Sequence, residues 1–188
     1  MLLLVAGLVI FLGVHLVPVF PSFRAQLVSR WGDGRYKGLF SAVSAVGFVL
    51  IVVGFAVAPR QVPLFAPSPA AIAIAPAAMA VALVLIAAGN LRGHLRRIVQ
   101  HPMLIGTLVW SGVHLLANGD VASTLLFGAF FAWAAIDLVS AIARRAVKTF
   151  TPRLAHDAIA IAGGVGAAFA FAYLHRILFG VRVMPFGL

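Results

Sequence analysis

The chain has 188 residues, of which 63% are hydrophobic and only 10% are charged, and its mean hydropathy is +1.12. This composition excludes a soluble domain with a polar surface and indicates an integral membrane protein. The net charge of +10 does not indicate nucleic-acid binding, because the basic residues lie between apolar runs rather than along one amphipathic face. No polar linker divides the chain, so we expect residues 1–188 to form a single domain.

Six apolar runs have the length of about 20 residues that an α-helix needs to cross a hydrocarbon core of about 30 Å. Because backbone groups in lipid must be paired within the segment, we expect these runs to be helices. The first run has no basic segment before it and no small-residue cleavage site, so we expect a retained helix. The predicted fold class is therefore all-α, a bundle of six transmembrane helices at residues 2–20, 38–58, 70–91, 102–118, 121–143 and 157–179.

The basic residues indicate how this bundle is oriented. Most of them follow the first, third and fifth runs: Arg24, Arg30, Arg35, Lys37, Arg92, Arg96, Arg97, Arg144, Arg145, Lys148 and Arg153. Only Arg60, Arg176 and Arg182 lie at the other side. Since Lys and Arg favour the cytoplasmic side, we expect a protein of the bacterial inner (cytoplasmic) membrane with both termini outside, in the periplasm.

The tetrapeptide Gly-Val-His-Leu occurs twice, at residues 13–16 and 112–115. The two copies lie in the first and fourth runs, which must cross in opposite directions, as in an inverted repeat of three helices plus three. Each histidine lies about 20 Å along its helix from the start of its run. We therefore expect His15 in the cytoplasmic third and His114 in the outer third, where two rings could bind opposite faces of a planar metal macrocycle.

Histidines at membrane depth are functional-site hypotheses, because an ionisable side chain there costs about 2.5–3.5 kcal/mol. His15, His114 and His175 are deep in their runs, whereas His94, His101 and His156 lie near the ends of runs, where interfacial water can satisfy an imidazole. A deep histidine that binds a ligand and one that hydrogen-bonds to a neighbouring helix both fit the sequence. His175 is an alternative to His15 as the partner of His114.

The remaining composition favours one cofactor. The chain has no cysteine and no glutamate, which excludes iron-sulfur clusters, thiolate metal sites and c-type haem attachment. Aromatic residues such as Phe11, Trp110 and Trp133 accompany the histidines, so a large hydrophobic cofactor suits the site better than a small ion, and haem b fits best. Its propionates would need cationic partners, for which the candidates are Arg24, Arg92, Arg96 and Arg97.

Two further polar residues have two interpretations each. Asp137 near the cytoplasmic end of the fifth run either pairs with Arg144 or Lys148, or accepts a hydrogen bond that orients a ligand histidine such as His15. Asn118 begins the turn Asn118-Gly119-Asp120 one helical turn after His114. It either closes the outer end of a pocket or is only part of the turn.

The chain resembles the NnrU family of bacterial membrane proteins, which is related to cis-zeta-carotene isomerase of plants and cyanobacteria. The most specific block begins at His101-Pro102-Met103-Leu104-Ile105-Gly106 and continues through Trp110 and the segment His114 to Asp120 to Phe127 and Trp133. Weaker matches are Phe11 to His15 with Arg24, and His175 to Gly180. The resemblance implies haem b with histidine axial ligands, which align with His15 and His114. The family name implies nitrite and nitric oxide metabolism.

Several functions remain open at this point. A bis-histidine haem protein could have a redox-gated cis-trans isomerase-like activity on an apolar substrate, or a role in denitrification with an apolar small molecule or gas as ligand. A non-enzymatic accessory protein for nitrite or nitric oxide reductase is a second class. The His101-Pro102 pair, which opens a membrane helix, is similar to isoprenylcysteine-type methyltransferases, although the missing glutamates disfavour them. His101 and Asp137 are candidates for groups that hydrogen-bond to the ligand histidines. The sequence assigns neither catalytic residues nor an oligomeric state.

Overall fold

The structure is a computed structural model that describes residues 1–59, 62–181 and 183. All of its regular elements within these ranges are helices, as predicted. In chain order they are α1 (Leu2–Leu16), the 3-10 helix η1 (Val17–Val19), α2 (Pro21–Trp31), α3 (Asp33–Ala56), α4 (Pro69–Asn90), α5 (His94–Val99), α6 (Pro102–Ala117), α7 (Val121–Ala143) and α8 (Leu154–Phe179). Each predicted apolar run corresponds to one of the longer helices. The helices α2 and α5 lie between these runs, where the sequence predicted no helix.

Five helices are long and apolar enough to cross a membrane in the part of the chain that the structure describes: α1 together with η1, α3, α4, α7 and α8. The sixth predicted span, α6, is apolar but has only 16 residues. A helix of that length spans about 24 Å, which is less than the hydrocarbon core of about 30 Å. The structure thus supports a membrane protein with five spans and a shorter apolar helix, and it does not confirm the count of six.

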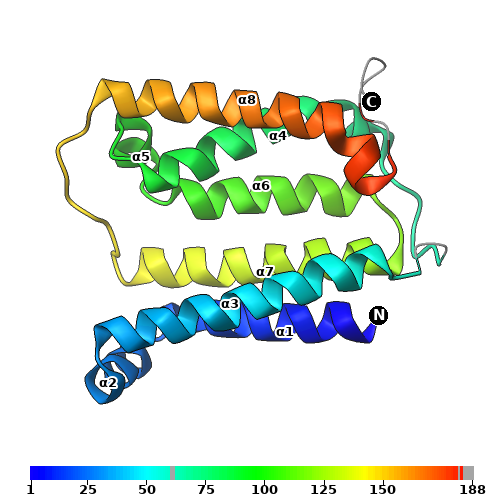
Figure 1. The fold of residues 1–188 in the computed structure, drawn as a ribbon. Helices are drawn as coiled ribbons and strands as arrows, with labels where there is room; N and C mark the ends of the chain where they lie inside the picture. Colours follow the sequence, from blue (N-terminus) through cyan, green and yellow to red (C-terminus); the bar gives the residue numbers. More distant parts are fainter. Residues whose placement is uncertain (60–61, 182, 184–188) are drawn as a thin grey trace.

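The helices form a bundle in which α7 lies between two groups (Figure 1). One group is α1 with α3, and the other is α6 with α4 and α8. The start of α1 and the end of α8 lie at one end of the bundle, together with the end of α6. At the opposite end lie α2, α5 and the connector between α7 and α8, which carry the basic residues. We call this the basic end.

Glycines let α1 and α3 approach closely. A Cβ atom added at Gly7 of α1 would lie 2.6 Å from the backbone nitrogen of Ile51, and one added at Gly47 of α3 would lie 2.7 Å from that of Phe11. Real Cβ atoms do not approach other atoms so closely, so only glycine permits this helix spacing. Close contact through small residues is how membrane helices gain packing energy without a hydrophobic driving force between them.

The second group uses the same device. Gly89 of α4 faces Met103 of α6, where an added Cβ would lie 2.7 Å from the Met103 Cβ, and Gly164 of α8 packs on the backbone of Val84. Gly163 and Gly166 on α8 have no atom of another segment within 4 Å of an added Cβ. They therefore lie away from the helix contacts.

The predicted inverted repeat is not confirmed. In such a repeat, α1, α3 and α4 would correspond to α6, α7 and α8, and equivalent pairs would pack alike. The contact between α4 and α6 is extensive, but no contact of similar extent joins the equivalent pair, α8 and α1, among the described helices. The two Gly-Val-His-Leu segments thus share local structure without an evident two-fold relation of the whole halves.

The proline-rich connector between α3 and α4 packs against the bundle. The backbone amides of Leu64 and Phe65 donate to the carbonyl oxygen of Gly119 at 2.7 and 3.3 Å, and the Val121 amide donates to Val62 at 3.2 Å. The Ser68 amide also donates to Leu116 at 2.9 Å. These bonds attach the connector to the turn between α6 and α7.

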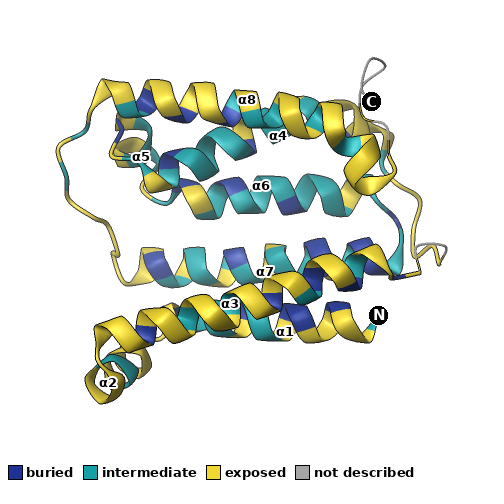
Figure 2. Ribbon diagram, in the orientation of Figure 1, coloured by how far each residue is buried: buried dark blue, intermediate teal, exposed yellow. Residues whose placement is uncertain are grey.

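Figure 2 shows that much of each long helix is exposed, and many of the exposed residues are large and hydrophobic. On α3, for example, the exposed residues include Val46, Phe48, Val49 and Val52. Large apolar patches on the surface of a protein indicate contact with a membrane or a partner. Because the exposed apolar residues are spread over five long helices, the pattern is that of a protein surrounded by lipid. The environment of this protein is therefore a lipid bilayer.

The α1–α3 contact yields a first prediction. The Gly47→Ala substitution should push α1 away from α3 and destabilise the protein by about 1–3 kcal/mol, the usual cost of overpacking. The measurement is the thermal unfolding midpoint of the detergent-purified protein. Gly38→Ala on the same helix is the matched control, since an added Cβ there meets no atom within 4 Å, and it should leave the midpoint unchanged or raise it slightly. Equal midpoints for both variants would contradict the proposed role of Gly47.

Candidate functional site

The two histidines of the repeated tetrapeptide have the same local geometry. His15 lies in the last turn of α1 and its Nδ1 is 2.6 Å from the carbonyl oxygen of Phe11, while His114 lies in the last turn of α6 and its Nδ1 is 2.8 Å from that of Trp110. A carbonyl oxygen only accepts, so Nδ1 carries the proton in both rings. Each Nε2 therefore has a free lone pair, which is the form of imidazole that binds a metal.

An aromatic core built around α7 surrounds both imidazoles. His114 stacks on Phe127 with ring centroids 4.6 Å apart, and His15 stacks on Phe11 at 4.2 Å. The edge of Trp133 meets His15 at 5.8 Å. We define the aromatic core as Phe11, His15, Phe40, Trp110, His114, Phe127, Phe130 and Trp133. Of these residues, the sequence had not singled out Phe40 and Phe130, because only the packing of α3 and α7 brings them to the histidines.

The two histidines lie at different levels of this core. Because α1 and α6 run in opposite directions, the last turn of α1 is toward the basic end and the last turn of α6 is toward the other end (Figure 1). Their contacts on α7, Trp133 and Phe127, are separated by about 9 Å along the helix axis. Between these levels Phe130 contacts Phe11 at 5.8 Å and Trp110 at 5.4 Å. Three rings from three helices thus form a middle layer.

The donor chemistry of the core suits haem b. Two neutral imidazoles with free Nε2 atoms lie among aromatic rings, and the Nε1 of Trp133 beside His15 is a buried donor without a hydrogen-bond partner among the described residues. Such a donor can serve a polar group of a bound molecule. The middle layer occupies the space between the two histidines, so one macrocycle bound by both would require Phe11, Phe130 and Trp110 to move.

With this geometry in view, the chain was compared with known proteins. The family model described as NnrU protein matches residues 3–183, nearly the full length. The chain belongs to the NnrU family. No curated protein and no solved structure matches it.

Asp137 of this NnrU protein lies in the part of α7 toward the basic end. It does not orient His15 through Nδ1, because that atom is bonded to the Phe11 carbonyl. No ion pair joins Asp137 to Arg144 or Lys148 among the described residues, and the Arg144 Nε donates to Ser140 Oγ at 3.1 Å. His101 directly precedes the start of α6, as predicted.

His175 lies in the last turns of α8. Its Nδ1 lies 2.9 Å from the carbonyl oxygen of Val181 just beyond α8, so this NnrU protein has a third imidazole with its proton on Nδ1. Asn118 donates to the backbone carbonyl of His114 at 2.8 Å and so caps α6. Of the two interpretations of Asn118, the structure supports the local one, because its amide bonds to the chain and not to the imidazole ring.

The arginines considered for propionates lie at the basic end. The guanidinium of Arg24 packs over the ring of Tyr36 at 5.4 Å, and that of Arg96 packs over Phe150 at 5.5 Å. Arg92 is part of a backbone network described below. Among the described residues none of these arginines contacts His114, which lies at the other end of the core. Only a group bound near His15 is on their side of the bundle.

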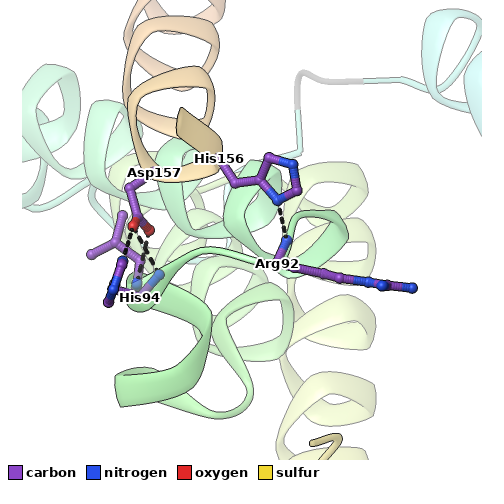
Figure 3. A network of polar contacts seen from close by, with 5 residues as sticks. Arg92, His94, His156 and Asp157 are labelled. Carbon is purple, nitrogen blue, oxygen red and sulfur yellow. Dashed lines mark hydrogen bonds and ion pairs between the residues drawn. The ribbon is translucent and has the colours of Figure 1, made fainter. Parts of the chain in front are cut away.

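A polar network that the sequence did not predict joins α8 to α5 (Figure 3). The buried carboxylate of Asp157 accepts from the backbone amides of His94 and Leu95 at 2.8 and 2.9 Å, and from the His94 Nδ1 at 2.8 Å. Next to it, the amide of Arg92 donates to the His156 ring at 3.0 Å. Gly93 leaves room for the carboxylate, because an added Cβ would collide with Asp157. Gly93 before His94 was the only feature of the sequence that could have indicated this network, because Asp157 lies more than sixty residues further along the chain.

This network gives a second prediction. The Asp157→Asn substitution leaves one acceptor oxygen for three donors and turns an amide group toward N–H groups, so α5 should detach more readily from α8. Hydrogen exchange of the amides of His94 to Val99 should become faster, measured by mass spectrometry on the purified protein. Asp33→Asn is the control, because Asp33 is an exposed partner of Lys37, and it should leave this segment unchanged. Unaltered exchange in Asp157→Asn would contradict the role of the network.

Proposed function

We propose that this NnrU-family protein binds haem b within the membrane, with the imidazoles of His15 and His114 as iron ligands once the middle layer of Phe11, Trp110 and Phe130 has moved from the space between them. The observation that carries the proposal is the shared tautomer: both rings hold their proton on Nδ1 through a backbone carbonyl and leave Nε2 free inside the aromatic core. In metal-binding histidines, the hydrogen bond from the ring nitrogen that does not bind the metal fixes the ring orientation and raises the basicity of the other nitrogen. The resemblance to cis-zeta-carotene isomerase, which implies the same ligands, supports it further.

The chain's own residues would contribute orientation and exclusion of water. The backbone carbonyls of Phe11 and Trp110 hold the imidazoles, and Phe127, Phe130 and Trp133 line an apolar site. The Trp133 N–H is available to a polar group of the macrocycle. When bound, haem would supply one-electron redox chemistry and the capacity to bind a small gas. Both capacities suit a protein whose substrate or partner is apolar or gaseous.

We further propose that all six long helices cross the bacterial inner membrane, with the basic end in the cytoplasm. The start of α1 and the end of α8 lie at the same end of the bundle, which supports an even number of crossings (Figure 1). The short α6 would then cross as the sixth span, enclosed by α4 and α7. The basic connectors at one end follow the rule that positive residues stay in the cytoplasm.

The finer activity has two forms under this proposal. One is a redox-gated cis-trans isomerase-like activity on an apolar substrate, and the other is a role in nitrite and nitric oxide metabolism, which the family name suggests. Once haem is established, a spectral change of the reduced protein on addition of nitric oxide would favour the second form. Conversion of a cis-polyene by the reduced protein alone would favour the first.

The proposal predicts a haem spectrum. The detergent-purified protein should show a Soret band, with α and β bands that sharpen on reduction by dithionite, and a pyridine haemochrome of haem b. The variants His15→Ala and His114→Ala should each change these bands and weaken haem binding by more than the roughly 10–100-fold loss typical of changes behind the ligands. His156→Ala is the control, because its ring bonds to the Arg92 amide outside the aromatic core, and its spectrum should match the parent.

Three other outcomes would revise this proposal. An unaltered haem spectrum of His114→Ala would show that His114 is not a ligand. An altered haem spectrum of His175→Ala would show that His175 is a ligand in place of His15 or His114. A colourless protein that also fails to take up added haemin would overturn haem binding. Copurification of such a protein with a nitrite or nitric oxide reductase would then support the accessory function.

A further inference from the structure

The helix α2 is the one long element of the basic end that the sequence did not reveal. It covers Pro21–Trp31, begins with a proline at its first turn and ends at Gly32, whose φ of 77° breaks the helix. Figure 1 shows it beyond the ends of α1 and α3, with its axis turned away from theirs. None of its residues is buried. It is therefore a surface helix at the end of a membrane bundle.

One face of α2 is apolar and still uncovered. Phe23, Leu27 and Trp31 follow each other at intervals of four, which places them on one side of a helix. Leu27 is half-buried against the bundle, but Phe23 is 49% and Trp31 41% exposed. The opposite side holds the small residues Ser22, Ala25 and Ser29, and Arg24 and Arg30 flank the apolar face on its two edges. Aromatic residues at the edge of an amphipathic helix are typical of helices that lie in a membrane interface.

Charge identifies the kind of surface that would cover this face. Around α2 the chain carries Arg24, Arg30, Arg35 and Lys37, and the single acid nearby, Asp33, is paired with Lys37 at 2.6 Å. Three arginines thus remain without a carboxylate partner in the described part of this segment. Clusters of basic residues next to a membrane helix attract anionic lipid headgroups.

An open cleft of about 470 Å³ lies between η1 and α2. Its walls are Val19, Phe20, Pro21 and Phe23, with Ser22 and Gln26 as the polar lining. Apolar walls with a hydroxyl and an amide at one side match the region of a phospholipid where acyl chains meet the glycerol. A folded protein partner would more often need a broad, weakly charged surface with an apolar centre.

We propose that α2 lies in the headgroup layer of the membrane leaflet at the basic end and binds anionic phospholipid there. Phe23 and Trp31 insert between the upper acyl chains, and Arg24 and Arg30 contact the phosphates. The proposal uses no haem and depends only on the membrane environment of the bundle, so it can fail or hold independently of the proposed function.

The position of α2 is tested by spin labels. The chain has no cysteine, so single-cysteine variants take a nitroxide at one site without a background. We expect a label at Phe23→Cys, in vesicles of equal parts phosphatidylglycerol and phosphatidylcholine, to be relaxed mainly by oxygen, and a label at Ser29→Cys mainly by a water-soluble nickel chelate. Val49→Cys and Lys148→Cys provide the lipid and water references. Equal access of the nickel chelate to Phe23 and Ser29 would overturn the proposal, and so would a Phe23 label that neither reagent reaches, because a protein would then cover it.

The lipid preference is tested by charge removal. In nanodiscs of the same mixture, phosphatidylglycerol should be enriched next to the parent protein, as measured by mass spectrometry of the retained lipids. The double variant Arg24→Gln, Arg30→Gln should reduce this enrichment several-fold. The matched double variant Arg145→Gln, Lys148→Gln removes two charges from another connector of the basic end and should reduce it less. Equal reductions, or none, would overturn specific binding by α2.

Discussion

The aromatic side of α7 is the contact on which the rest of the bundle depends. Among the described helices, α7 packs against α1 and α3 on one side and α6 on the other, and no extensive contact joins those two groups directly. Phe127, Phe130 and Trp133 make the ring contacts of α7 with both groups. In lipid, helices gain little from burying apolar area, so the dispersion energy of large, interlocking rings is what selects this arrangement. The same rings form the walls of the candidate site.

The position of the histidines in the last turn of their helices has a chemical consequence. A ring that leans back toward the preceding turn reaches the carbonyl four residues earlier, and this bond sets the tautomer without help from another helix. This geometry therefore does not require the orienting role predicted for Asp137, because the carbonyl already holds Nδ1. The candidate site thus needs no buried carboxylate, which agrees with the scarcity of acids in the chain.

Polar chemistry is concentrated at the basic end. There the Asp157 network attaches α5 to α8, the arginines pack on Tyr36 and Phe150, and α2 presents its uncovered face. At the other end, backbone hydrogen bonds attach the connector between α3 and α4 to the turn between α6 and α7. A membrane bundle can place such polar contacts only near its ends, because water or headgroups are available there to satisfy whatever remains unpaired.

Composition and hydropathy were enough to determine that the chain is an all-helical membrane protein, where its long helices lie and which end is basic, because apolar length and connector charge are properties of local sequence. The repeated tetrapeptide likewise identified His15 and His114, whose carbonyl partners are in the same helix. Only the tertiary structure decided that Phe130 lies between them, that Asp157 meets His94, and that Pro21–Trp31 is a separate helix at the bundle's end. The position of Phe130 and the contact of Asp157 with His94 depend on residues far apart in the chain. The helix Pro21–Trp31 depends on two helix breaks in a segment that is too polar to be predicted as a membrane span. Those long-range contacts are set by how closely glycine and aromatic side chains let the helices approach, which no local pattern records.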